Sequence, residues 1–233
     1  MHLFYTPGID GSEHVLDEIE SRHAVKVLRL KNGDRVNLVD GLGTWFEAII
    51  IDGNPKKCRL EILSKKEQYK PLSYNLHIGI SPTKNMDRFE WFVEKATEIG
   101  VTEITPLLCT HSERKKLRSD RIEKVIISAM KQSLKAYKPK LNQITPFSEW
   151  VKIPFEGSKA IGYCKDTALT PLWDLPAKNG LLMAIGPEGD FSEEEVKRAI
   201  KNDFKAVSLG ESRLRTETAG VVSCSYAHLM FMK

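Results

Sequence analysis

Two glycine-containing loops carry the residues of this chain whose types are able to do chemistry. IGPEGDFS (185–192) follows the apolar run LLMA, and LGESRLRTETAG (209–220) follows KAVS. Glycine lets the backbone turn tightly and approach a ligand closely. The carboxylates of these loops can accept a proton, and Arg215 can stabilise negative charge. The two loops therefore predict a ligand site, with charged helix starts on an ordinary surface as the alternative.

Common motifs do not account for these loops. Neither matches the phosphate-binding patterns G-x-x-x-x-G-K-[ST] and G-x-G-x-x-G, and the chain has no H-E-x-x-H or G-x-S-x-G. The six histidines show no ligand spacing, and the four cysteines lie far apart without a C-x-x-C pair. We therefore expect neither a zinc enzyme nor a serine hydrolase, and no metal site.

Composition places the chain among ordinary globular proteins. It has 233 residues, of which 41% are hydrophobic and 28% charged. The net charge of +4 only mildly favours an anionic partner. The sequence shows no basic and apolar leader and no apolar run of about 18 residues. We expect a cytoplasmic protein that binds no membrane.

The first 70 residues predict a small β-rich domain. Residues 34–41, 44–53 and 58–63 alternate or run apolar between turn residues, which is typical of short strands in a barrel or sandwich. One helix is expected over residues 12–28. A polar, proline-containing linker is expected around residues 65–74.

The rest of the chain alternates strands with helices and predicts an α/β domain with a mostly parallel sheet. Strands are expected at 74–81, 104–110, 159–164, 181–186 and 206–210. Helices are expected at 87–100, 119–137, 192–204 and 216–232. Ser119 is expected to cap the second of these, and Ser192 with Glu195 a capping box on the third. Leu181 and Leu182 are expected in the sheet core. In such sheets, ligands bind at the carboxyl ends of the strands, where the two loops lie.

The two loops resemble the signatures of the RsmE family. These are S-adenosylmethionine-dependent methyltransferases of the SPOUT superfamily that modify N3 of a uridine in small-subunit ribosomal RNA. Further family segments are resembled by residues 23–41, by Lys84 through Val101, by 104–115 and by 129–139. The resemblance thus covers nearly the whole chain.

The resemblance implies a fold and partners. It implies an N-terminal PUA-like β-barrel that binds RNA, over residues 1–70, and a SPOUT methyltransferase domain over residues 71–233. In that domain the C-terminal segment forms a trefoil knot. It also implies a homodimer that acts on 16S ribosomal RNA or the small ribosomal subunit.

The chain departs from the family pattern at a few positions. Asp190 stands where the family often has glycine, so this loop is expected to be less free. Glu211 and Ser212 replace a usual Pro-Arg pair, which leaves Arg213 one place along. Lys135 or Lys138 stands near an expected arginine, which keeps the charge but loses the planar guanidinium.

The cofactor implied by the resemblance is S-adenosyl-L-methionine, held mainly by backbone groups and apolar contacts. The first loop is expected to contribute Ile185, Gly186, Pro187, Glu188 and Gly189. The second is expected to contribute Ser208, Leu209 and Gly210, with Leu214 as an apolar wall for the adenine. The strand end at Cys164 to Asp166 is a weaker candidate.

Methyl transfer to uridine N3 needs in-line positioning and removal of the imide proton. Arg215 is the strongest candidate for catalysis or substrate charge, because a cation just before a helix opposes the helix dipole. Glu188 and Glu217 are candidate proton acceptors, although each also fits a role in stabilising a helix start. Thr216 is expected to cap the last helix while its backbone faces the site.

Basic residues concentrate at 22–31 and 114–140, and as a set they favour a polyanion. Any single one fits a solvated surface equally well. Tyr137, between lysines, has a ring able to stack on a base. The predicted RNA contacts are Arg22, Lys26 and Arg29, at helical spacing, with Lys84, Arg88, Arg114, Lys115 and Lys131.

Two alternatives stay open. One is a non-catalytic RNA-binding dimer in which only the N-terminal barrel works. The other is a SPOUT methyltransferase that acts on another RNA base.

Overall fold

The computed structural model describes residues 2–164, 169–176 and 179–232. Contacts group the chain into two compact units. Unit 1 comprises residues 1–71 and 130–138, and unit 2 comprises residues 72–129 and 139–233. Segment 130–138 thus packs with the N-terminal residues although it is far from them in sequence.

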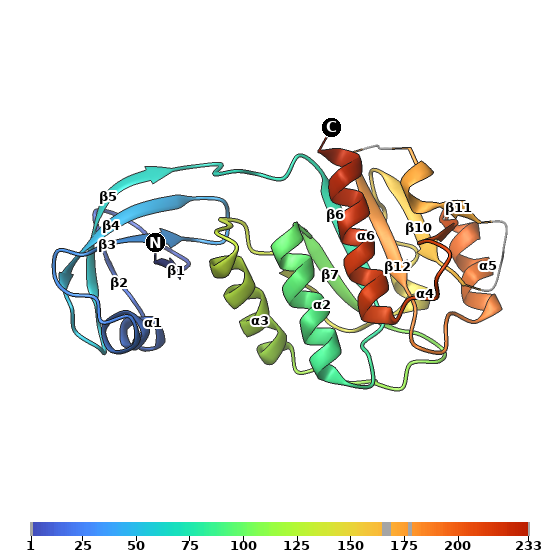
Figure 1. Cartoon of the computed structure of the whole chain (residues 1–233), viewed down its shortest axis with the longest axis horizontal. Helices are drawn as coiled ribbons and strands as arrows, with labels where there is room; N and C mark the ends of the chain where they lie inside the picture. Colours follow the sequence, from blue (N-terminus) through green and yellow to red (C-terminus); the bar gives the residue numbers. More distant parts are fainter. Residues whose placement is uncertain (1, 165–168, 177–178, 233) are drawn as a thin grey trace. The chain divides into compact units, whose positions relative to one another are not determined.

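Unit 1 is built on a curled five-stranded sheet in the order β1-β3-β4-β5-β2 (Figure 1). The strands are β1 (Leu3–Tyr5), β2 (Glu13–Val15), β3 (Arg35–Val39), β4 (Trp45–Asp52) and β5 (Arg59–Lys66). The β1–β3 pair is parallel and the other pairs are antiparallel. The three strands expected at 34–63 are confirmed. Alternating side chains of β3, among them Val36 and Leu38, enter a core closed by Phe4 and Leu16.

The helix expected over residues 12–28 is shorter than predicted. Residues Glu13–Val15 form β2, which pairs with β5. The helix α1 (Glu18–Arg22) begins after Asp17, whose carboxylate accepts the backbone N–H of Glu20, and continues into a π-helical turn, η1 (His23–Val27). Arg29 lies beyond this turn with a φ of +58°. Arg22, Lys26 and Arg29 therefore do not form one regular helical face.

Unit 2 holds a sheet of eight strands in the described residues, in the order β11-β13-β10-β12-β6-β7-β8 with β9 beside β7. Its strands are β6 (Asn75–Ile80), β7 (Glu103–Leu108), β8 (Lys140–Leu141), β9 (Thr145–Pro146), β10 (Ser158–Gly162), β11 (Thr170–Pro171), β12 (Gly180–Ile185) and β13 (Lys205–Ser208). The pairings are parallel, which confirms the predicted fold class. The short strands β8, β9 and β11 carry no alternating pattern and were not expected.

Helices cover both faces of this sheet. They are α2 (Met86–Ile99), α3 (Ser119–Gln132), α4 (Phe147–Trp150), α5 (Glu193–Lys201) and α6 (Thr216–Phe231), with a 3-10 turn, η2 (Leu172–Asp174). Figure 1 shows α2 and α6 side by side on one face. Buried side chains of α2 and α6, with Ile122 and Ile126 of α3, share one core with Leu181 and Met183. Buried side chains of α4 and α5 share another core with Leu182.

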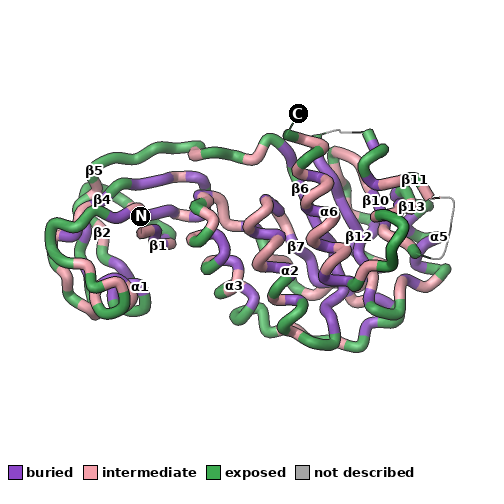
Figure 2. The backbone as a smooth tube through the Cα atoms, viewed as in Figure 1, coloured by how far each residue is buried: buried purple, intermediate pink, exposed green. Residues whose placement is uncertain are grey.

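The central strand β12 is buried along its whole length, which Figure 2 shows as a continuous purple segment. Since both faces of a parallel sheet are covered, its strands are apolar at successive positions rather than at alternate ones. Leu181 and Leu182 point to opposite faces and are both fully buried, which confirms them as sheet core.

Helix ends follow the sequence signals at Gly100 and Ser192. Gly100 ends α2 with a φ of +135°, and Ser192 with Glu195 forms the predicted capping box on α5. The predicted cap at Ser119 is wrong by one residue, because Ser119 is already the first helical residue of α3. The helix expected to reach residue 137 ends at Gln132, because Leu134 takes a φ of +56° that a helix does not accept. The residues that follow pack in unit 1 instead.

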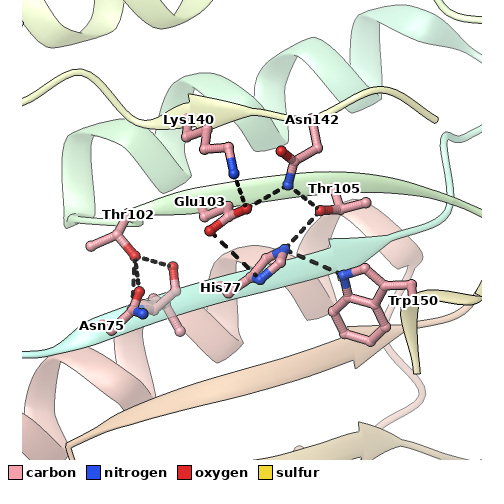
Figure 3. Close-up of polar contacts among 9 residues, drawn as sticks. Asn75, His77, Thr102, Glu103, Thr105, Lys140, Asn142 and Trp150 are labelled. Carbon is pink, nitrogen blue, oxygen red and sulfur yellow. Dashed lines mark hydrogen bonds and ion pairs between the residues drawn. The ribbon is translucent and has the colours of Figure 1, made fainter. Parts of the chain in front are cut away.

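A buried polar network lies where β6, β7 and β8 begin (Figure 3). The indole N–H of Trp150 donates to Nε2 of His77 over 3.3 Å, and the same nitrogen lies 2.7 Å from the Thr105 hydroxyl. Because Nε2 accepts, the neutral ring carries its proton on Nδ1, which faces Glu103 at 3.9 Å. Burial lowers the pKa of His77 to about 4, so this contact joins a neutral imidazole to a carboxylate and is not an ion pair at neutral pH.

Glu103 holds the outer side of this network. Its Oε1 accepts from the Asn142 amide at 2.6 Å and from Lys140 Nζ at 3.0 Å. Burial raises the pKa of Glu103, but the hydrogen bonds from Asn142 and Lys140 favour the carboxylate, and the net shift is downward. The network satisfies the polar groups that the start of the sheet buries.

Among the described residues, no helix has the length and apolar character needed to cross a membrane.

Candidate active site

A cavity of about 870 Å³ opens at the carboxyl ends of β10, β12 and β13. It is lined by residues 162–164, 185–188 and 207–217, and by Arg88 of α2. The chain passes from β10 to β12 on one side and returns through α5 to β13 on the other side of β10. The carboxyl edge of an α/β sheet at such a reversal is where ligands bind. All these lining residues belong to unit 2.

The first cavity loop, residues 185–190, is held by several polar contacts. Glu188 is exposed, and its Oε1 accepts the backbone N–H of Lys84 at 3.0 Å. The carbonyl oxygen of Asp190 lies 2.9 Å from Nδ1 of His111. A Cβ at Gly186 would lie 3.0 Å from the Phe191 ring, so a side chain there would require the ring to shift by a few tenths of an ångström.

Asp190 stands where the resembled family often has glycine, and its backbone conformation is one that suits glycine. Its φ is +65°, in the region that favours glycine and that aspartate enters more readily than most residues. Its carboxylate accepts the N–H of Phe191 at 2.7 Å and that of Cys164 at 3.4 Å. The aspartate therefore adopts a conformation that glycine takes readily and adds side-chain contacts, which is consistent with the expectation of a less free loop.

The second cavity loop runs from Ser208 to Glu217. Ser208 Oγ donates to the Gly210 carbonyl at 3.0 Å and lies 3.1 Å from the N–H of the same residue. Gly210 has a φ of +128°, and a side chain there would meet nothing within 4 Å. Glycine is thus required by the backbone conformation and not by lack of space.

The predicted cap of the last helix is wrong by one residue. Arg215 is the N-cap, with extended backbone at φ −72° and ψ 157°, and Thr216 is already helical. The Thr216 hydroxyl donates instead to the Gly186 carbonyl at 3.0 Å. This bond ties the second loop to the first.

The candidate catalytic side chains all line the cavity. Glu217 is buried, and its Oε1 lies 3.8 Å from Nε of Arg88, which the sequence suggested as an RNA contact. Arg215 is exposed, and no ion pair to it is found in the described part of the chain. The cavity thus combines a buried carboxylate with three arginines, Arg88, Arg213 and Arg215.

The cofactor candidates are brought together as well. Ile185, Gly186, Pro187, Glu188, Ser208, Leu209, Gly210 and Leu214 line the cavity. Gly189 is in the same loop and lies against His111. Sequence reasoning missed Tyr163 and Trp173, which also line the cavity and belong to no motif.

Of the weaker candidate strand end, Cys164 to Asp166, the structure describes only Cys164. Cys164 lines the cavity, and burial together with Asp190 raises the pKa of its thiol. The thiol therefore stays protonated near neutral pH and is a poor nucleophile. Asp166 lies outside the described residues.

The predicted RNA contacts of unit 2 fall into two groups. The Arg114 guanidinium donates to the backbone carbonyls of Thr83 and Lys84, at 3.3 and 2.8 Å, and so holds the loop before α2. Lys84 Nζ pairs with Glu113 at 3.0 Å. Lys115 is exposed.

The predicted RNA contacts of unit 1 likewise include residues paired with acids and exposed residues for which no ion pair is described. Lys131 is partly buried and pairs with Glu20 at 2.5 Å, and Arg22 pairs with Glu18 at 2.9 Å. Lys26 and Arg29 are exposed. In the described residues, no group of three or more metal-ligating side chains is found.

Comparisons with known proteins cover both units. The family described as RNA methyltransferase domain matches residues 70–228, and that described as RNA methyltransferase PUA domain matches residues 16–63. The ribosomal RNA small subunit methyltransferase E of Buchnera aphidicola is 31% identical over 98% of this chain and 93% of its own length.

Solved structures agree with these matches. A structure from Porphyromonas gingivalis has a TM-score of 0.93 and 39% identity, and covers 100% of this chain and 99% of its own. A ribosomal RNA small subunit methyltransferase E from Neisseria gonorrhoeae, bound to S-adenosyl methionine, has a TM-score of 0.84 and 29% identity, with 97% and 95% covered. The resemblance found in the sequence is confirmed, and the chain belongs to the ribosomal RNA small subunit methyltransferase E family.

Proposed function

We propose that this protein transfers a methyl group from S-adenosylmethionine to N3 of a uridine in 16S ribosomal RNA. The observation that carries the proposal is the cavity at the ends of β10, β12 and β13, where two family-specific loops are joined by the Thr216–Gly186 hydrogen bond. Membership of the family supports both the reaction and the RNA substrate.

The residues of the cavity fit S-adenosylmethionine. The volume of about 870 Å³ is in the range of small-molecule sites. Backbone groups of residues 185–189 and 208–210 would hold the polar parts, and Leu214 would contact the adenine. When bound, the cofactor supplies an electrophilic methyl group on a positively charged sulfur.

The arginines would stabilise the nucleophile. Uridine N3 carries a proton at neutral pH, and its removal spreads negative charge over the flanking carbonyl oxygens. Arg215 is exposed, lines the cavity and is the N-cap residue of α6. Its guanidinium would lower the energy of that anion, as preorganised positive charge does in other transfer reactions.

Glu217 is our candidate for the proton acceptor. It is buried in the cavity wall beside Arg88, whereas Glu188 is exposed and already accepts the Lys84 N–H. An acceptor must lie within hydrogen-bond reach of the proton that it removes, and the cavity offers Glu217 for that position. Thr216 would keep the two loops in register.

The RNA would contact exposed basic residues of both units, among them Lys26, Arg29 and Lys115. From the family resemblance we further infer a homodimer, a trefoil knot in unit 2, domains at 1–70 and 71–233, and a cytoplasmic location. These inferences rest on the resemblance.

The test is methyl transfer by the purified protein and its Arg215→Ala variant. The wild type should bind S-adenosylmethionine in calorimetry and methylate 16S ribosomal RNA at uridine N3. Arg215→Ala should lower transfer by about 100-fold or more and keep the melting temperature. Arg118→Ala, an exposed arginine paired with Asp120 on α3, is the matched control and should transfer normally.

Other outcomes point to the alternatives. No cofactor binding by the wild type would leave an RNA-binding protein without this activity. A methylated base other than uridine would leave a methyltransferase of different specificity. Wild-type transfer by Arg215→Ala would remove Arg215 from the reaction.

A further inference from the structure

Three partly exposed tyrosines border one hydrophobic cluster of unit 1. Tyr5 belongs to β1, Tyr69 follows β5, and Tyr137 follows α3. They pack against a buried cluster of Leu3, Val39, Trp45, Met130 and Ala136. All these residues lie in unit 1, so their arrangement is fixed within it.

Tyr69 lies on a firm support. Its ring stacks on Trp45 with centroids 4.6 Å apart and an interplanar angle of 27°. Trp45 is buried, and its indole N–H donates to Asn37 Oδ1 at 3.1 Å. The backbone N–H of Tyr69 donates to the Gly43 carbonyl at 2.9 Å. The Tyr69 ring is therefore held by stacking on Trp45, and the Tyr69 backbone by its hydrogen bond to Gly43.

The backbone around Tyr69 is strained. Gln68 and Lys70, on either side of it, have φ values of +48° and +47°. Side chains with a Cβ enter this region at a cost of about 1–2 kcal/mol each. Such strain persists where the surrounding structure imposes it, and it is often found at functional segments. Here the two strained residues lie directly before and after Tyr69.

The loop of residues 40–44 lies directly against the other two rings. A Cβ at Gly41 would lie 2.8 Å from the Tyr5 ring, and one at Gly43 would lie 2.2 Å from the Tyr137 ring. The carboxylate of Asp40 is used inside the loop, where it accepts the N–H groups of Leu42 and Thr44. The loop thus packs against the two tyrosine rings, and its Asp40 carboxylate is occupied by hydrogen bonds within the loop.

Lysines approach the tyrosine rings. Lys66 Nζ and Lys70 Nζ lie 5.7 and 5.2 Å from the Tyr69 ring centroid, and Lys138 Nζ lies 6.0 Å from that of Tyr5. The neighbouring acid, Glu67, pairs with Lys65 at 2.9 Å. Positive charge and aromatic faces therefore coincide, which is the combination that binds single-stranded nucleic acid.

We propose that these residues form a binding surface for a single-stranded segment of RNA. The tyrosine surface is defined as Tyr5, Tyr69 and Tyr137 with Lys66, Lys70 and Lys138. Bases stack on the tyrosines and displace the lysine ammonium groups, which then contact the phosphates. The proposal rests on the proposed function only for the source of the RNA.

The experiment measures binding of a fluorescein-labelled oligouridylate by fluorescence anisotropy. Tyr69→Ala should weaken binding about tenfold, the loss of one stacked base, and Tyr69→Phe should bind like the wild type. Equal binding by Tyr69→Ala and wild type, with both folded, would overturn the proposal. Thermal unfolding by circular dichroism reports whether Tyr69→Ala folds.

A second variant keeps the cluster intact in case Tyr69→Ala unfolds. Replacing Lys66 and Lys70 by glutamine should reduce the slope of log Kd against log salt by about 0.7 per lysine. The matched control replaces Lys56 and Lys57, exposed at the opposite end of the β4–β5 hairpin, and should bind like the wild type. An unchanged slope in the first pair, or an equal change in both pairs, would overturn the proposal.

Failure of the surface and failure of the function give different results. Cofactor affinity is measured on the same proteins by calorimetry and should be equal in wild type and Tyr69→Ala. If the wild type methylates RNA while the tyrosine variants bind RNA normally, only the surface is wrong. If the wild type binds no S-adenosylmethionine but Tyr69→Ala loses oligouridylate, only the proposed function is wrong.

Discussion

The Thr216 hydroxyl donates a 3.0 Å hydrogen bond to the carbonyl oxygen of Gly186. The two residues lie 30 positions apart, in the two loops that form most of the cavity wall. One side chain thus couples the loop after β13 to the loop after β12. Both loops follow strands at the same edge of the sheet. The shape of the cavity between them therefore depends on this hydrogen bond.

Thr216→Val removes this bond and keeps the shape of the side chain. The Gly186 carbonyl then loses a partner at a cost of about 1 kcal/mol, so S-adenosylmethionine should bind about fivefold more weakly. Calorimetry measures the change, and Thr216→Ser, which keeps the hydroxyl, should bind normally. Equal affinity of Thr216→Val and wild type would show that the bond does not shape the site.

Glu217→Gln tests the proton acceptor. The rate of transfer should fall by about 100-fold, because an amide cannot take up the imide proton. The control, Glu188→Gln, should retain most of the rate, since its amide oxygen can still accept the Lys84 N–H. Single-turnover assays measure both, and a large loss in Glu188→Gln alone would exchange the two roles.

Stability should fall in mild acid because of His77. Its pKa in the folded protein is about 4, below the ordinary value of 6.5, so the unfolded chain binds the proton more readily. The stabilisation is therefore complete above about pH 6.5 and is lost as the pH falls toward 4, by up to about 3 kcal/mol. Glu103, with a lowered pKa, acts in the same direction at lower pH.

Urea denaturation at a series of pH values measures this slope. His77→Gln should unfold at lower urea at pH 7, since the network around Trp150 is disturbed, but should show a smaller loss between pH 6.5 and 4.5. The same slope in both proteins would assign the pH dependence to other groups.

Gly220→Ala should destabilise unit 2 although alanine favours helices. A Cβ at Gly220 in α6 would lie 2.6 Å from the Phe92 ring of α2. Overpacking of this kind costs about 1–3 kcal/mol, which exceeds the gain of about 1 kcal/mol in helix propensity. Thermal unfolding measures the difference. Ser225→Ala, on a less buried part of the same helix, should change stability by less than about 0.5 kcal/mol, and a stabilised Gly220→Ala would contradict the close α2–α6 contact.

Local signals in the sequence predicted the regular elements well. The apolar face of α2, its stop at Gly100 and the capping box of Ser192 and Glu195 are properties of neighbouring residues, so a linear pattern contains them. The two motif loops could also be assigned to strand ends, since parallel strands bring their carboxyl ends to one edge.

Contacts between distant residues could not be predicted in this way. The end of α3 depends on the packing of residues 130–138 in unit 1, and the Lys84–Glu188 contact joins residues 104 positions apart. The pairing of Glu217 with Arg88 likewise needs α2 and α6 side by side. Trp173 in the cavity wall had no sequence signal, because a single aromatic after a short strand is not distinctive.

The most direct test of the central claim is nucleoside mapping of 16S ribosomal RNA from a strain that lacks this gene. N3-methyluridine should be absent from the deletion strain, return when the wild-type gene is restored, and stay absent with Arg215→Ala. An N3-methyluridine level in the deletion strain equal to that of the parent would contradict the account.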